Sequence, residues 1–83
     1  MDQLARTPTQ LGAALRRRRK SLGLSQAELG QRINRRQATV SGLEGGEVDT
    51  KLTTLMDALA VLDLELVVRA RSSSSVADLE AIF

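Results

Sequence analysis

Apolar residues recur at helical spacing along most of this chain, and the period changes only toward its C-terminal end. Leu11, Leu15 and Leu22 lie on one stripe of a helix that we expect to run from Pro8 to about Leu22. Thr7 is expected to cap this helix, with Pro8 at the first helical position, where a missing amide is no loss. Gly23 is expected to end it as a left-handed cap.

Two short helices are predicted next, with a tight turn between them. Ser25 and Glu28 have the spacing of a capping box, so a helix starts at Gln26 and continues through the apolar residues Leu29 and Ile33. Asn34, which tolerates the left-handed conformation, marks its end. A second helix covers residues 37–44, QATVSGLE. Two short helices joined in this way form a helix-turn-helix, whose second helix presents its outer face to a duplex groove.

A further helix is expected after the glycines that stop the second one. Asp49 or Thr50 is expected to cap it, and its core stripe comprises Leu52, Leu55, Leu59 and Leu62. From residue 64 the period becomes two, which predicts a strand over residues 64–71. Because no second strand is predicted, the strand is expected to pair with its copy in a homodimer. Its pairing residues are Leu64, Leu66, Val67, Val68 and Ala70. The alternative is an extension of the preceding helix through Val68.

The chain is thus divided into four parts. Residues 1–6 are expected to be disordered, residues 7–63 to form the helix-turn-helix domain and residues 64–71 to form the dimerisation strand. Residues 72–83 are expected to be a flexible tail, since they begin with a run of serines. Leu79, Ile82 and Phe83 give the tail an apolar end that fits either a segment that orders on a protein partner or a frayed, idle terminus.

The amino-acid composition argues against a metal site or an enzyme active site and indicates where phosphate could bind. The 83 residues contain no Cys and no His, so we expect no metal site, no cofactor and no catalytic residues, and hence no enzyme. The N-terminal residues lack the apolar stretch of a signal peptide, and no apolar run approaches a membrane span, so a cytoplasmic protein without a membrane partner is expected. Residues 1–36 carry nine Lys/Arg against two Asp/Glu, and residues 37–83 carry three against eight. A basic front half suits contact with phosphates.

One cation in the basic run of residues 16–20 is expected to point inward. Successive helical residues turn by about 100°, so these five cations spread around the whole helix and cannot all face DNA. Arg19 is the candidate for the inward position, with Glu44 as its partner at the end of the helix at 37–44. Such a pair would join the first helix to the third. The alternative is two unrelated surface charges.

The segments LGAALRRRRKSLGLSQAELGQRI, QATVSGLEGG and LTTLMDALAVLDLEL strongly resemble the Xre/Cro-type helix-turn-helix repressors. The TPTQL opening, the QAT-hydrophobic-S helix, LTTL and the terminal strand resemble more narrowly the HipB-type antitoxins of HipA–HipB toxin–antitoxin systems. The resemblance implies a mainly α fold: a compact four- to five-helix, lambda-repressor-like domain with a C-terminal strand paired across a homodimer. It also implies a repressor of its own operon that binds a palindromic operator and a HipA-like kinase toxin.

The resemblance also assigns the DNA contacts. Base edges are expected to meet the start of the recognition helix, at Arg36, Gln37, Ala38, Thr39 and Ser41. The chemistry agrees, because Gln can bond to adenine, Arg to guanine, and the methyl groups of Ala and Thr to a thymine methyl. Phosphate contacts are expected from Ser25 and Gln26, at the start of the preceding helix, and from Arg32 and Arg35.

One departure and two alternatives remain. Gly42 occupies a position where relatives often carry a side chain, and it is expected to cost helix stability and to remove a base contact. In place of an antitoxin, the chain could be a stand-alone Xre-family regulator without a toxin. It could also be an interaction adaptor that uses the same fold without binding DNA.

Overall fold

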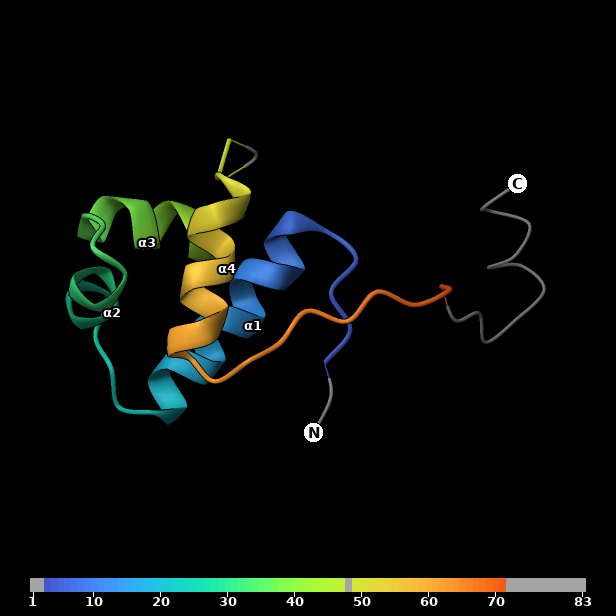
Figure 1. The fold of residues 1–83 in the computed structure, drawn as a ribbon, viewed down its shortest axis with the longest axis horizontal. Helices are drawn as coiled ribbons and strands as arrows, with labels where there is room; N and C mark the ends of the chain where they lie inside the picture. The colour runs from blue at the N-terminus through green and yellow to red at the C-terminus, as the bar shows by residue number, and fades with distance from the viewer. Residues whose placement is uncertain (1–2, 48, 72–83) are drawn as a thin grey trace.

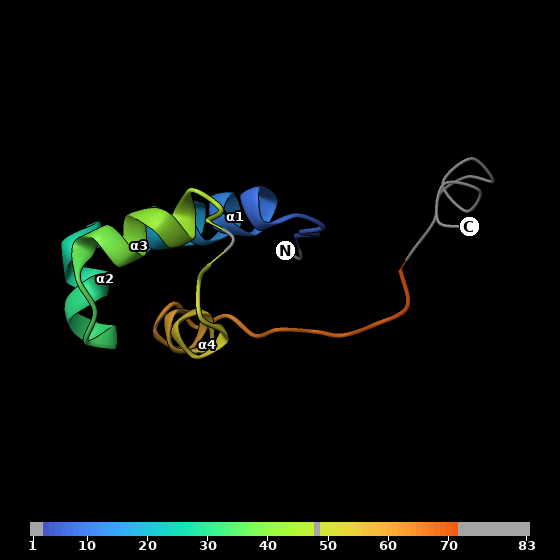
Figure 2. The ribbon, with the colours of Figure 1, turned by 90° about the horizontal axis from the view of Figure 1, so that it is seen from above.

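The computed structural model describes residues 3–47 and 49–71. Within these ranges the chain forms four helices, α1 (Pro8–Ser21), α2 (Gln26–Ile33), α3 (Gln37–Glu44) and α4 (Leu52–Val61). The prediction of a mainly α, helix-turn-helix fold is therefore confirmed. In Figure 2, α1 and α3 lie along one side of the domain, α2 lies at one end and α4 lies on the other side. No helix in the described part of the chain is long and apolar enough to cross a membrane.

Local signals at the helix ends explain where α1 and α2 begin and end. The Thr7 hydroxyl accepts from the amide of Gln10 at 3.1 Å, with Pro8 at the start of α1. Gly23, at φ 73°, follows that helix in the left-handed region, as predicted. α2 and α3 have the predicted bounds, and Asn34 ends α2 at φ 57° and ψ 48°. These boundaries depend on short-range chemistry that the sequence carries directly.

The core is aliphatic and includes side chains from all four helices, with α2 packed against α3 and α4 and with α1 packed against α3. Its fully buried side chains include Leu15, Leu29, Val40 and Leu62. Leu24, just before the Ser25 cap, and Leu29, four residues after it, both belong to this core, which is the arrangement called a hydrophobic staple. The staple fixes the angle at which the chain enters α2.

Three expectations for the helices are wrong. Leu52 is 67% exposed and Leu22 is 44% exposed, although both were assigned to core stripes. Leu52 is the first residue of α4 and Leu22 is the C-cap residue of α1, so both lie at helix ends, outside the buried middle of each stripe. The cap of α4 is Lys51, which makes no side-chain capping bond. The Thr50 hydroxyl instead donates to the Glu47 carbonyl at 3.1 Å.

Residues 64–71 are neither helix nor strand in the structure. The helical alternative is wrong, because α4 ends at Val61 and Asp63 adopts a left-handed conformation, at φ 55°. The strand assignment is not confirmed. Figure 1 shows the segment running away from the helices in an extended course. The pairing with a second subunit therefore remains a prediction. Leu79, Ile82 and Phe83 lie outside the described residues, as do residues 1–2.

Arg18 holds the end of α4 against α1, a contact that the sequence analysis missed. Its Nε donates to the Leu62 carbonyl at 2.9 Å, and its Nη2 lies 3.8 Å from Asp63 Oδ2. The contact fixes the point from which residues 64–71 leave the domain. Nothing in the local sequence marks Arg18 for this role, because its partner lies 44 residues away.

Candidate DNA-binding surface

The turn between α2 and α3 brings the two helices close together. Arg35 donates its backbone amide to the Gly30 carbonyl at 2.8 Å, so the chain folds back over the last turns of α2. A Cβ at Gly30 would lie only 2.8 Å from the Arg35 carbonyl oxygen. Glycine at this position, with Asn34 in the left-handed conformation, therefore permits the tight turn. The outcome is a short, rigid connection in front of the first residue of α3.

The two faces of α3 differ in exposure. Val40 and Leu43 are buried and attach the helix to the core. On the opposite side, the residues assigned to base contacts are open to solvent: Arg36, Gln37, Ala38 and Ser41 are exposed, and Thr39 is half-buried. Arg36 is the N-cap residue, and Gln37 is the first residue of the helix. This face offers amide, hydroxyl, guanidinium and methyl groups, which are the groups that read base edges in a major groove.

Of the four residues assigned to phosphate contacts, Ser25, Gln26 and Arg32 lie at the cap of α2 or on α2, and Arg35 lies in the turn before α3. Arg32 and Arg35 are exposed, as is Ser25, whereas Gln26 is half-buried. The Ser25 oxygen accepts from the amide of Glu28 at 3.0 Å, so the serine caps α2. The Arg35 guanidinium donates to the Asn34 carbonyl at 3.1 Å and keeps further N–H groups for an anion. The positions are compatible with a phosphate-contacting rim.

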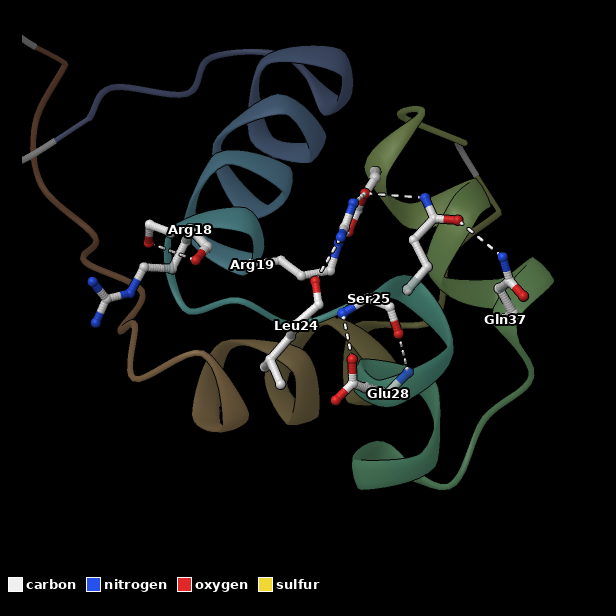
Figure 3. A network of polar contacts seen from close by, with 9 residues as sticks. Arg18, Arg19, Leu24, Ser25, Glu28 and Gln37 are labelled. Carbon is white, nitrogen blue, oxygen red and sulfur yellow. Dashed lines mark hydrogen bonds and ion pairs between the residues drawn. The ribbon is translucent and has the colours of Figure 1, made fainter.

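A buried ion pair joins α1 to the end of α3 (Figure 3). Arg19 Nε lies 2.6 Å from Glu44 Oε2, and Arg19 Nη2 lies 3.0 Å from Glu44 Oε1. The remaining guanidinium nitrogen, Nη1, donates to the Leu24 carbonyl at 2.8 Å. The hydrogen bond to Glu44 raises the pKa of Arg19, which keeps the guanidinium charged. This is the pair that the sequence analysis predicted, with the bidentate geometry that suits arginine and a carboxylate.

Gln26 connects this pair to the face of α3. Its Nε2 donates to Glu44 Oε1 at 3.2 Å, and its Oε1 accepts from Gln37 Nε2 at 3.5 Å. The dashed lines of Figure 3 trace this chain of contacts between Arg19 and Gln37. From the sequence, each of these residues has a separate expected role, and the connection between them is a feature of the folded chain alone. The one feature of the sequence that could have indicated this connection is that Gln26 and Gln37 are the first residues of the two helices of the motif.

Gly42 is buried, and the side chain next to it is that of Glu47. A Cβ at this position would lie 2.6 Å from the side-chain carboxyl carbon of Glu47, whose own amide donates to the Gly42 carbonyl at 3.0 Å. Glu47 therefore covers this part of α3. A side chain at position 42 would first have to displace Glu47, and the expectation that Gly42 removes a base contact stays a prediction.

Acid is expected to weaken the cap of α2 through Glu28. The Ser25 amide donates to Glu28 Oε1 at 3.0 Å, and this backbone hydrogen bond, followed by a side-chain bond with Ser25, lowers the pKa of Glu28. A lowered folded-state pKa stabilises the protein above the unfolded-state pKa, and that stabilisation is lost as pH falls through the folded-state value. Glu28→Gln keeps the acceptor oxygen but does not titrate. Its unfolding free energy in urea should therefore fall less than that of the unmodified chain between about pH 7 and about pH 3.

Glu65→Gln, which changes an exposed glutamate outside the helices, is the matched control and should leave the acid dependence as it is. Equal acid dependence in Glu28→Gln and the unmodified chain would contradict the role given to Glu28.

Comparison with known proteins agrees with this geometry. The chain matches the family described as a helix-turn-helix domain over residues 10–72. It is 38% identical over 60 residues to the HipB antitoxins of two Escherichia coli strains. Those residues are 72% of this chain and 64% and 68% of the two relatives, so the match leaves about a third of each relative uncovered.

Solved structures give the same result. A HipB variant in an O2 20mer complex aligns with a TM-score of 0.80 at 35% identity, covering 87% of this chain and 100% of that one. HipB in a HipA–HipB–O2–O3 complex aligns with a TM-score of 0.78 at 34% identity, covering 86% of this chain and 100% of that one. The chain therefore belongs to the helix-turn-helix domain family, within its HipB-like group.

Proposed function

We propose that this chain is a sequence-specific, double-stranded-DNA-binding repressor and a HipB-like antitoxin. It acts in the cytoplasm as a homodimer on a palindromic operator of its own operon and neutralises a HipA-like kinase by binding it. Its role is binding, without catalysis or a cofactor. The observation that carries the proposal is the outer face of α3, which is open and polar at Gln37 and Ser41 while its inner face is buried in the core.

The pattern of charges supports the same proposal. Arg32, on α2, and Arg35, in the turn before α3, are exposed cations, which suits contacts to phosphates next to the bases that α3 would read. Similarity to HipB in complexes with operator fragments and with HipA supports the operator and the kinase as partners of this chain. One α3 helix reads only a few base pairs. A dimer supplies the second copy that a palindrome needs.

Gln37→Ala is expected to weaken binding to the operator by about 1 to 3 kcal/mol while leaving binding to unrelated duplexes nearly unchanged, because it removes a contact to a base edge. Fluorescence anisotropy with labelled DNA from upstream of the gene, and with a shuffled duplex, measures both affinities.

Arg32→Gln is the contrasting variant in this experiment. It is expected to weaken binding to both duplexes and to reduce the dependence of binding on salt, since it removes a contact to phosphate. Equal losses on the two duplexes in Gln37→Ala would contradict the base-reading role of Gln37.

Val67→Pro is expected to raise the dissociation constant of the homodimer about tenfold or more. Proline removes the backbone amide at position 67 from both chains of the dimer, so two hydrogen bonds between the strands are lost. Each contributes about 1 kcal/mol to the free energy of dimerisation. In the described chain, the amides of residues 65–71 donate no backbone hydrogen bond, which leaves them open to a second subunit. Sedimentation equilibrium measures the constant. Val67→Ala keeps the amide and is the control; an unchanged dimer in the proline variant would refute the pairing.

A further inference from the structure

We propose that Glu44 is a positioning residue for base recognition: acting through Gln26, its buried carboxylate fixes which atoms of the Gln37 side-chain amide face the DNA. The inference rests on the proposed function and deepens it. It gives the ion pair with Arg19 a part in sequence specificity besides holding α1 to α3. The observation behind it is the continuous chain of contacts from Arg19 to Gln37 (Figure 3).

The carboxylate at the buried end of this chain of contacts determines which group donates and which accepts in each hydrogen bond. Glu44 is 8% exposed, and both of its carboxylate oxygens accept hydrogen bonds from the Arg19 guanidinium, so they face Gln26 as acceptors. Gln26 must therefore turn its NH2 group toward Glu44, as the 3.2 Å contact from Nε2 to Oε1 shows. The Gln26 oxygen then points away from Glu44, where it accepts from Gln37 Nε2. Each amide is oriented by the residue before it.

The Arg19–Glu44 pair, which orients the two glutamine side chains, is held in place by several hydrogen bonds. Arg19 is 6% exposed and uses its guanidinium nitrogens on both Glu44 oxygens and on the Leu24 carbonyl. The carboxylate plane is thereby fixed relative to α1 and to the start of α2. Gln26 is half-buried and Gln37 is exposed, so the order passes from the interior to the solvent face of α3. A free glutamine side chain at the surface would sample both amide orientations.

The fixed orientation determines which base Gln37 accepts. One N–H of Gln37 is directed to Gln26, which leaves its other N–H and its oxygen for the DNA. A donor beside an acceptor matches adenine, whose N7 accepts and whose N6 donates in the major groove. Guanine presents two acceptors there, N7 and O6, and a Gln37 amide that could turn freely would offer its NH2 group to either. Holding the amide in one orientation therefore favours adenine over guanine.

Selection from a library of random duplexes tests this inference with the full chain. The unmodified protein is expected to enrich a palindromic sequence, and Gln37→Ala identifies the position that Gln37 reads, which should be adenine. Gln26→Met keeps the Arg19–Glu44 pair and removes the connection. Arg19→Met combined with Glu44→Leu removes the acceptor for Gln26 as well as both charges, so it leaves no buried charge unpaired. In both variants the preference for adenine over guanine at that position should fall about twofold to tenfold, while the preferences at the other positions are kept.

Arg18→Met is the matched control, since it removes an arginine contact of similar length that joins α1 to the end of α4 and does not involve Glu44, Gln26 or Gln37, and it should leave all base preferences unchanged. Circular dichroism verifies that each variant is folded; if the double variant does not fold, Gln26→Met alone decides. An unchanged adenine preference in folded Gln26→Met would overturn the positioning role while leaving the proposed function intact. Failure of the unmodified chain to enrich any sequence would overturn the proposed function and this inference with it.

Discussion

Arg19→Met is expected to lower the free energy of unfolding by about 3 to 5 kcal/mol, the cost of removing one partner of a buried ion pair. The substitution leaves the Glu44 carboxylate at 8% exposure without the two guanidinium bonds of 2.6 and 3.0 Å that satisfy it. It also removes the donor to the Leu24 carbonyl. Urea denaturation followed by circular dichroism measures the loss. For a domain of this size, such a loss is a large fraction of the total stability.

Two further variants distinguish the cost of breaking the buried ion pair from the cost of simply removing a positive charge. Arg16→Met changes an exposed arginine in the same basic run and should cost little. Arg19→Met combined with Glu44→Gln removes the charge from both partners, so it should be more stable than Arg19→Met alone. A loss in Arg19→Met no larger than that in Arg16→Met would contradict a structural role for the buried pair.

Gly12→Ala is expected to destabilise the domain by about 1 to 3 kcal/mol or more, although alanine favours a helix over glycine by about 1 kcal/mol. Gly12 is buried where α1 crosses the end of α3, and a Cβ there would lie 2.6 Å from the Leu43 carbonyl oxygen and 2.7 Å from the Glu44 carbonyl carbon. These are backbone atoms of a packed helix, so they can separate only if α1 and α3 move apart. Thermal unfolding measures the change.

Gly42→Ala is the matched control for this prediction. It makes the same exchange in a helix, but its Cβ would meet the side-chain carboxylate of Glu47, which is exposed and can rotate away. The expected result is unchanged stability or a gain of up to about 1 kcal/mol. Equal stabilisation by the two substitutions would show that α1 does not pack as closely on α3 as the structure indicates.

The parts of the fold that the sequence predicted correctly depend on contacts between near neighbours. The Ser25–Glu28 capping box and the left-handed Asn34 are local features, and they determine where α2 begins and ends. Burial depends instead on where neighbouring helices stop. Leu52 continues the spacing of Leu55 and Leu59, yet it is the first residue of α4 and lies outside the buried middle of the stripe. Periodicity identifies the apolar face of a helix but not the length of that face that is buried.

The DNA-binding surface shows the same difference between local features, which the sequence predicts, and contacts between distant residues, which it does not. The base-reading positions follow from their place at the start of α3, which the motif gives directly. The link from Glu44 through Gln26 to Gln37 joins residues 18 and 11 positions apart, and it exists only because α2 and α3 pack at one particular angle. Residues 64–71 are a different case, since the predicted pairing needs a second chain and so depends on more than the folding of one subunit.

The most direct test of sequence-specific DNA binding is a competition measurement with the unmodified chain. Labelled DNA from upstream of its gene is bound at near-physiological salt and then displaced either by the same duplex unlabelled or by a shuffled duplex of equal length and composition. Recognition by α3 predicts that the upstream duplex competes about a thousandfold better or more, the ratio typical of specific over non-specific binding. Equal competition by the two duplexes would contradict it.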